Sequence, residues 1–161
     1  MTIDPRREGE SGPLRKLLLA VIVITMIGLS VELALLEHVE PGWQQAPFIG
    51  FGLGLVGLGL ILTRPSPGAF NFFRLVMAAF LIVGAVGVYL HVNANAELER
   101  EMDPDAGGTE LLWIALRGGV PAGAPGAMAQ LGLLGLIFAY RHPAETKARH
   151  VGKGHARGST D

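Results

Sequence analysis

The residues whose side chains are best suited to bind or react lie in one stretch, 88–102 (VYLHVNANAELEREM). It sets His91, Asn95, Glu99 and Met102 at spacings of four, four and three residues, which places them on one stripe of an α-helix. The stretch is apolar at its start and acidic at its end. We therefore expect the end of a membrane-spanning helix that continues into water and carries a polar stripe.

A second polar position, Glu32, is predicted to lie at the same depth as His91. Glu32 lies sixteen residues beyond Lys16, and His91 lies seventeen residues beyond Arg74. At about 1.5 Å per residue, both positions are about 24–26 Å from those basic anchors. In a hydrocarbon core of about 30 Å, that is one layer just below the outer surface. We expect Glu32 and His91 to meet there.

A metal site is the first of three interpretations of this layer. Carboxylate, imidazole and amide groups are suitable ligands for Zn²⁺, Mn²⁺ or Fe²⁺. The repeated Glu-x-x-His pair of di-iron bundles is absent from the sequence. The candidate ligands are Glu32, His91, Asn95, Glu99, Glu37 and His38.

A structural pair is the second interpretation. Polar groups inside a membrane usually pair with one another, so Glu32 and His91 would then only fix the packing of two helices.

A cation or proton path is the third interpretation, since carboxylates and histidines also act as relays in membranes. Such a path needs further polar groups in the cytoplasmic half of the predicted bundle. The sequence offers few of them there, chiefly Thr25 and Gln130.

Composition narrows the class of protein. The chain has 161 residues, half of them hydrophobic, and a mean hydropathy of +0.41. Its 13 basic and 14 acidic residues nearly balance, which does not suggest a nucleic-acid-binding protein. It has no cysteine, which excludes disulfides, thiol relays and cysteine-ligated metals. No nucleophile–base pair or cofactor motif is present either, so an enzyme is the least supported class.

The sequence contains four apolar runs of near membrane-spanning length. They predict an all-α fold, a four-transmembrane-helix bundle with an outward helical extension and a short interfacial helix. The expected helices are 17–40, 47–63, 72–102 and 125–141, with the interfacial helix at 109–117, a flexible tail at 1–16 and a disordered basic tail at 144–161. The glycine-rich helix 47–63 is suited to close helix packing, within the chain or in a homo-oligomer.

Charge distribution predicts the orientation. Four spans put both termini on one side, and eleven of the 13 basic residues then lie on that side. Only Arg100 and Arg117 lie opposite. Because basic residues mark the cytoplasmic side, we expect both termini in the cytoplasm and the acidic layer outside.

Three segments carry a resemblance to a known family. They are ELALLEH at 32–38, YLHVNANAELERE at 89–101 and APGAMAQLGLLGLIFAYRHP at 124–143. Together they resemble a family of small bacterial four-helix membrane proteins that has no known activity. The resemblance covers about residues 17–143 and implies four spans and a bacterial inner-membrane location.

Two function hypotheses follow from these patterns. The first is an integral membrane protein that binds a metal ion or cation at the acidic and histidine cluster on the outer side. The alternative is a non-catalytic structural or assembly subunit of a membrane complex, in which the Glu/His pair only fixes helix packing.

Overall fold

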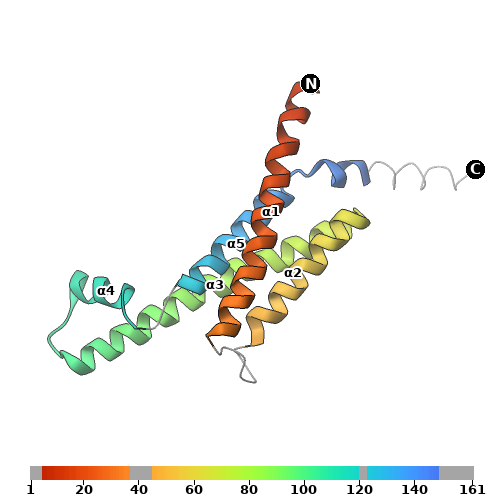
Figure 1. Ribbon diagram of the computed structural model, residues 1–161. Coiled ribbons are helices and arrows are strands. Elements are labelled where there is room, and N and C mark those ends of the chain that lie inside the picture. Colours follow the sequence, from red (N-terminus) through yellow and green to blue (C-terminus); the bar gives the residue numbers. More distant parts are fainter. Residues whose placement is uncertain (1–4, 37–44, 120–122, 149–161) are drawn as a thin grey trace, which may run out of the picture.

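The fold is built from α-helices around one long central helix (Figure 1). The computed structural model describes residues 5–36, 45–119 and 123–148. The helices are α1 (Pro5–Leu35), α2 (Ala46–Thr63), α3 (Pro67–Met102), α4 (Gly108–Leu116) and α5 (Gly123–Ala139). The described part of the chain contains no strand. The expected all-α class is confirmed.

Three helices are long and apolar enough to cross a membrane. They are Gly12–Leu35, Ala46–Thr63 and Pro67–Met102. The fourth apolar helix, Gly123–Ala139, has 17 residues and is shorter. This composition is that of a multi-pass membrane protein.

Helix α3 organises the packing of the others. It lies along α5 over the largest contact in the structure and also contacts α2 and α4. Helix α1 packs against α2 and α5, and its backbone does not approach that of α3. Figure 1 shows the C-terminal part of α3 extending to one side, with α4 folded back beside it. The end of α3 therefore projects beyond the packed helices.

Glycines allow α3 and α5 to pack backbone to backbone. A Cβ added at Gly84 would lie 2.5 Å from the amide nitrogen of Ala129. One added at Gly132 would lie 2.5 Å from the carbonyl oxygen of Met77. Such distances leave no room for a side chain, and small residues at an interface are how membrane helices approach closely. Gly84 meets Ala129, whereas the earlier Met77 meets the later Gly132, so the two helices are antiparallel.

The glycines of α2 divide between two faces. A Cβ added at Gly50 would lie 2.7 Å from the ring of Phe80, and one added at Gly54 would lie 2.6 Å from the methyl group of Met26. One added at Gly52 or Gly59 would meet nothing within 4 Å. Part of the glycine-rich helix therefore packs within the chain, and part of it faces outward.

Aromatic side chains fill the core. Phe70, Phe73 and Phe80 of α3 are buried. Phe80 meets Phe51 of α2 edge to face at a centroid distance of 5.4 Å, and Phe73 meets Phe138 of α5 at 6.1 Å. These pairs join three helices, and edge-to-face contacts of this kind add stabilisation beyond burial alone.

The predicted ends of the first helix need correction. Residues 1–16 were expected to form a flexible tail, but α1 begins at Pro5. Proline is suited to a first helical turn because it has no N–H to leave unpaired there. At its other end α1 stops at Leu35, short of the expected residue 40, and residues 37–40 lie outside the described part.

The third helix begins earlier than the predicted residue 72. It starts at Pro67, and the hydroxyl of Ser66 accepts a hydrogen bond from the amide of Ala69 at 3.1 Å. A serine cap followed by proline is a strong helix start. The prolines at 65 and 67 suggested a turn that would last to residue 71, whereas the second of them begins the helix.

Candidate functional site

The structure does not bring Glu32 and His91 together. Glu32 is exposed on α1, while the adjacent Leu29 and Leu33 are buried. His91 is half-buried on α3, and the backbones of α1 and α3 do not approach each other. The expected contact between Glu32 and His91 is therefore not formed.

Asn95 has a structural role. Its side chain is 4% exposed, and its amide nitrogen donates to the carbonyl oxygen of Ala115 at 2.9 Å. Ala115 is in the last turn of α4, and its carbonyl also accepts a longer bond from the amide of Gly118 at 3.4 Å. Gly118 packs on the same amide, since a Cβ there would lie 2.5 Å from Cγ of Asn95. Asn95 thus holds the end of α4 against α3.

The remaining predicted ligands are not assembled into a site. Glu99 is half-buried on α3, eight residues and about 12 Å from His91 along the helix. Glu37 and His38 lie outside the described residues. Within the described ranges no group of three or more His, Asp or Glu side chains is placed to hold a metal ion. The metal site therefore stays a prediction, and this geometry does not support it.

A polar cluster that we did not predict lies at the opposite end of the molecule. Arg74 of α3 forms a two-point ion pair with Glu145, whose side chain is 8% exposed. Arg74 also donates to the carbonyl oxygen of Ala139 at 2.7 Å. Glu145 lies in a helical turn over residues 143–148. The start of the expected disordered tail at 144–161 is therefore folded onto α3.

Arg15 completes this cluster from α1. It donates to the carbonyl oxygens of Phe138 at 2.7 Å, Tyr140 at 3.2 Å and Arg141 at 3.5 Å. Two guanidinium groups, from α1 and α3, therefore cover the C-terminal carbonyls of α5. Cations are favourable at this end of a helix because its dipole is negative there.

His142 lies between two aromatic rings in the same region. Its ring centroid is 5.1 Å from those of Phe70 and of Phe138. Its Nδ1 accepts a hydrogen bond from the amide of Ala144 at 3.3 Å, which requires that nitrogen to be unprotonated. Burial, followed by the positive charge of Arg15, lowers the pKa of His142. Both effects favour the neutral ring.

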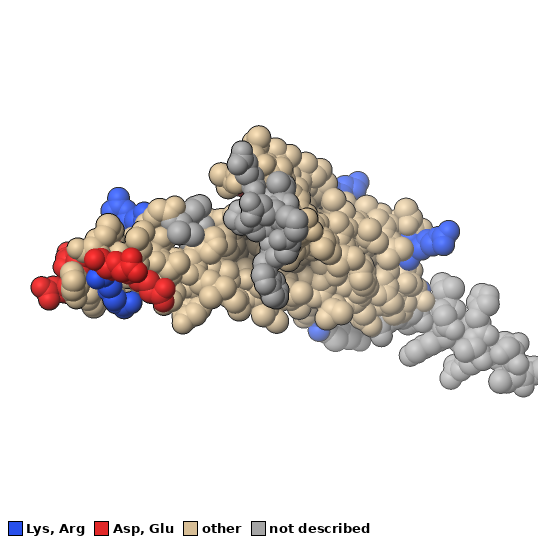
Figure 2. Space-filling view, turned by 90° about the horizontal axis from the view of Figure 1, so that it is seen from below, with Lys and Arg blue, Asp and Glu red and all other residues tan. Residues whose placement is uncertain are grey.

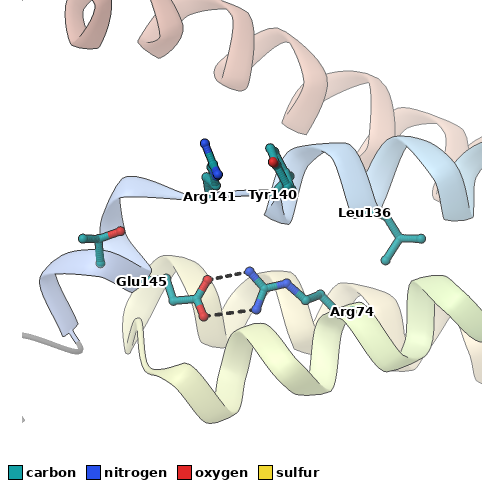
Figure 3. Close-up of a pocket in the computed structure, with 6 residues that line it drawn as sticks. Arg74, Leu136, Tyr140, Arg141 and Glu145 are labelled. Carbon is teal, nitrogen blue, oxygen red and sulfur yellow. Dashed lines mark hydrogen bonds and ion pairs between the residues drawn. The ribbon is translucent and has the colours of Figure 1, made fainter. Parts of the chain in front are cut away.

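Arg141 has a backbone conformation that is unusual for a residue other than glycine. Its φ is 44°, in the left-handed region that glycine normally occupies just after a helix. Its guanidinium lies over the ring of Tyr140, 5.4 Å from the centroid. Beside these residues is an open pocket of about 570 Å³, and Figure 3 shows the Arg74–Glu145 pair facing each other within it.

Charge separates along the molecule. In Figure 2 the acidic side chains gather at one end, the middle is free of visible charge, and basic side chains occupy the other end. The acidic end is that of α3 and α4, where two basic residues, Arg100 and Arg117, also lie. The basic end contains the Arg15, Arg74 and Glu145 cluster.

Comparison with known proteins adds no assignment. No family model matches the chain, and neither a curated protein nor a solved structure matches it. The family resemblance of the three segments therefore remains a prediction.

Proposed function

We propose that the chain is a four-span protein of a bacterial inner membrane, with both termini in the cytoplasm, that serves as a non-catalytic subunit in the assembly of a membrane complex. The bacterial location follows from the family resemblance. The fourth span would be α5, whose 17 residues are at the lower limit for crossing a bilayer. The orientation is supported by Arg15, Arg74 and Arg141, which lie at one end of the fold and would be cytoplasmic.

Helix α4 would lie in the outer interface. Leu112, Trp113 and Leu116 are exposed on the side away from α3, at 53%, 61% and 49%. Arg117 stacks on Trp113 at 5.3 Å from the ring centroid. Apolar and aromatic side chains beside a cation are typical of a helix at the membrane surface.

The observation that carries the assembly role is the exposed position of Glu32. It is exposed on α1, and its neighbours one turn later, Leu35 and Leu36, are 78% and 55% exposed. A charged side chain facing lipid is costly, by about 2.5–3.5 kcal/mol at the middle of a helix and less toward its end. A polar group from a neighbouring membrane helix would remove that cost.

Gly28 provides space for such a helix. It precedes Glu32 by one turn, and a Cβ added there would meet nothing within 4 Å. A glycine next to a polar residue is a common arrangement where two membrane helices pack closely. Gly28 and Glu32 together form what we call the α1 docking face.

The partner we propose is a different protein, with a Lys, Arg or neutral hydrogen-bond donor at this depth. In the apolar stretches 17–36, 46–63, 72–92 and 123–139, the formally charged residues are Glu32 and Arg74. A second copy in the same orientation would bring Glu32 against Glu32 rather than Arg74, which lies toward the basic end. Like charges repel strongly in such a medium. A homo-oligomer through the outward Gly52 and Gly59 of α2 remains a separate prediction.

The other polar residues support a non-catalytic, structural role for the protein. Asn95 bonds to α4, and Arg74 bonds to Glu145 and α5. Each joins two segments of the chain, which is the use of polar groups that a scaffold requires.

The test measures the size of the complex by native gel electrophoresis. Membranes of the organism that naturally makes the protein are first solubilised in a mild detergent. We expect the tagged native protein to migrate as a complex with a second protein, and Glu32→Ala to migrate alone. Glu110→Gln is the matched control, since Glu110 is an exposed acid outside the apolar helices. A Glu32→Ala complex of unchanged size and composition would contradict the proposal.

A further inference from the structure

We propose that the pocket at the basic end binds a phosphate group, and that its source is the headgroup of an anionic phospholipid. This inference uses the membrane placement of the chain but not the partner at Glu32. Six residues line the pocket, namely Arg74, Leu136, Tyr140, Arg141, Glu145 and Thr146. Its volume of about 570 Å³ is within the range of small-ligand sites.

The charge around the pocket is positive. Among the lining residues, Arg74 and Arg141 contribute two guanidinium groups and Glu145 one carboxylate, which leaves a net charge of +1. Arg15, bonded to the carbonyl oxygen of Arg141, adds a further positive charge beside the pocket. The C-terminal end of α5 would ordinarily repel an anion. Here Arg15 and Arg74 cover its last carbonyls, so that repulsion is reduced.

Arg141 is the residue best placed to bind the anion. Arg74 is engaged by Glu145 and Ala139, whereas Arg141 is exposed and its guanidinium stacks on Tyr140. Stacking fixes the plane of a guanidinium and leaves its N–H groups to form paired bonds with phosphate oxygens. Figure 3 shows Tyr140 and Arg141 next to each other at the end of α5.

The backbone at Arg141 agrees with a binding role. A side-chain-bearing residue at φ 44° carries a conformational cost that glycine would avoid. Arg15 holds this conformation through the carbonyl oxygens of Tyr140 and Arg141. Strained backbone that the surrounding structure maintains is often found at ligand sites.

The position of the pocket favours a lipid over free phosphate. Leu136 lines it from within the apolar helix α5, and Tyr140 follows the end of that helix. Tyrosine is common at the headgroup level of membranes. A phospholipid would place its phosphate at Arg141 and Thr146 and the start of its acyl chains at Leu136. Basic pockets at the cytoplasmic ends of membrane helices bind anionic headgroups in this way.

The experiment measures lipid binding to the full chain by native mass spectrometry from a neutral detergent. The probes are phosphatidylglycerol, phosphatidylcholine with the same acyl chains, and inorganic phosphate. We expect phosphatidylglycerol to bind at least about fivefold more tightly than phosphatidylcholine. Arg141→Ala should lose that preference. Arg64→Ala, which removes an exposed cation outside the pocket lining, should keep it.

Arg141→Gly separates binding from folding. Glycine adopts the left-handed backbone freely, so this variant should be at least as stable as the native protein and should still lose the preference for phosphatidylglycerol. Normal binding by Arg141→Gly, or equal weakening by Arg141→Ala and Arg64→Ala, would overturn the proposal. Binding of inorganic phosphate alone, with the same dependence on Arg141, would support the phosphate site and show its source to be free phosphate.

Discussion

Arg74 and Glu145 are 71 residues apart in the sequence and form a two-point ion pair at the basic end of the fold. The pair attaches the segment after α5 to the first turns of α3. Glu145 is 6% exposed, so its carboxylate is removed from water and depends on this partner. Removing one partner of such a pair costs more than the pair itself contributes.

Glu145→Ala should therefore destabilise the fold by about 1–3 kcal/mol, because Arg74 loses its charged acceptor and keeps only weaker ones. The measurement is helix melting by circular dichroism in detergent. Thr146→Ala, at the adjacent exposed position, should melt like the native protein. Equal melting temperatures for the two variants would show that the ion pair does not hold this segment.

The glycines of the α3–α5 contact should not tolerate alanine. Gly84→Ala and Gly132→Ala each place a methyl group against partner backbone, and overpacking of this kind costs about 1–3 kcal/mol. Gly52→Ala and Gly59→Ala add the same methyl group on α2 where nothing lies within 4 Å. Thermal unfolding of the four variants should separate them into these two pairs. A large loss at Gly52 or Gly59 would instead indicate a contact outside this chain.

Asn95→Ala should release the end of α4 from α3. The carbonyl of Ala115 loses the Asn95 donor and keeps a weaker backbone one, the amide of Gly118 at 3.4 Å, so the loss is about 1–2 kcal/mol. A local loss of 1–2 kcal/mol makes opening about 5–30-fold more frequent. Hydrogen exchange over residues 108–118 should accelerate by that factor, whereas Asn93→Ala, on the exposed side of α3, should leave it unchanged. Equal exchange in both variants would refute the role of Asn95.

Stability should fall as the pH drops below about 6.5. His142 is neutral in the fold because burial and Arg15 lower its pKa, whereas an unfolded histidine titrates near 6.5. Between these two pKa values the unfolded chain binds the extra proton, so acid favours unfolding. Once the pH is below the pKa of His142 in the folded protein, this group causes no further loss of stability.

The measurement compares melting from pH 8 to pH 5 for the native protein and for His142→Phe. The phenylalanine retains a ring between Phe70 and Phe138 but cannot titrate. Its stability should change less over this range than that of the native protein. Parallel curves would assign the pH dependence to other groups.

A metal ion should not be required for the fold. Asn95 is bonded to α4 and Glu32 is exposed on another helix, so the predicted ligands that fall within the described residues do not converge. Elemental analysis of the purified protein is expected to find less than one Zn, Mn or Fe per chain, with no change in His91→Ala. One metal per chain, lost in both His91→Ala and Glu32→Ala, would restore the metal-site hypothesis.

The sequence predicted the all-α class because long apolar runs are a local signal, although the first and third helices begin earlier than predicted. It could not predict which helices are neighbours. The spacing of Glu32 and His91 from basic residues predicts only their depth, which is one coordinate. The rotation of each helix about its axis and the choice of neighbour depend on side-chain packing. The glycines at 84 and 132 place α5 beside α3, and α1 then packs on α5 and α2.

The Arg74–Glu145 pair was missed for a different reason. The segment after α5 is polar and contains glycine farther on, which is the usual composition of a solvated tail. The partner of Glu145 is distant in the sequence, so no local spacing could indicate burial. One signal was present: Arg74 lies within an apolar helix, and a charge in that position needs an acid or a helix end nearby.

The most direct test of the assembly role is site-specific photocrosslinking in native membranes. A photoreactive residue is placed at Val31, the exposed residue that precedes Glu32 in the sequence, or at Leu133 on α5. The two positions are matched in exposure, at 52% and 50%. The assembly role predicts one discrete protein adduct at Val31, lost when Glu32 is replaced by alanine, and no such adduct at Leu133. Lipid adducts alone at Val31, or a protein adduct that does not depend on Glu32, would contradict it.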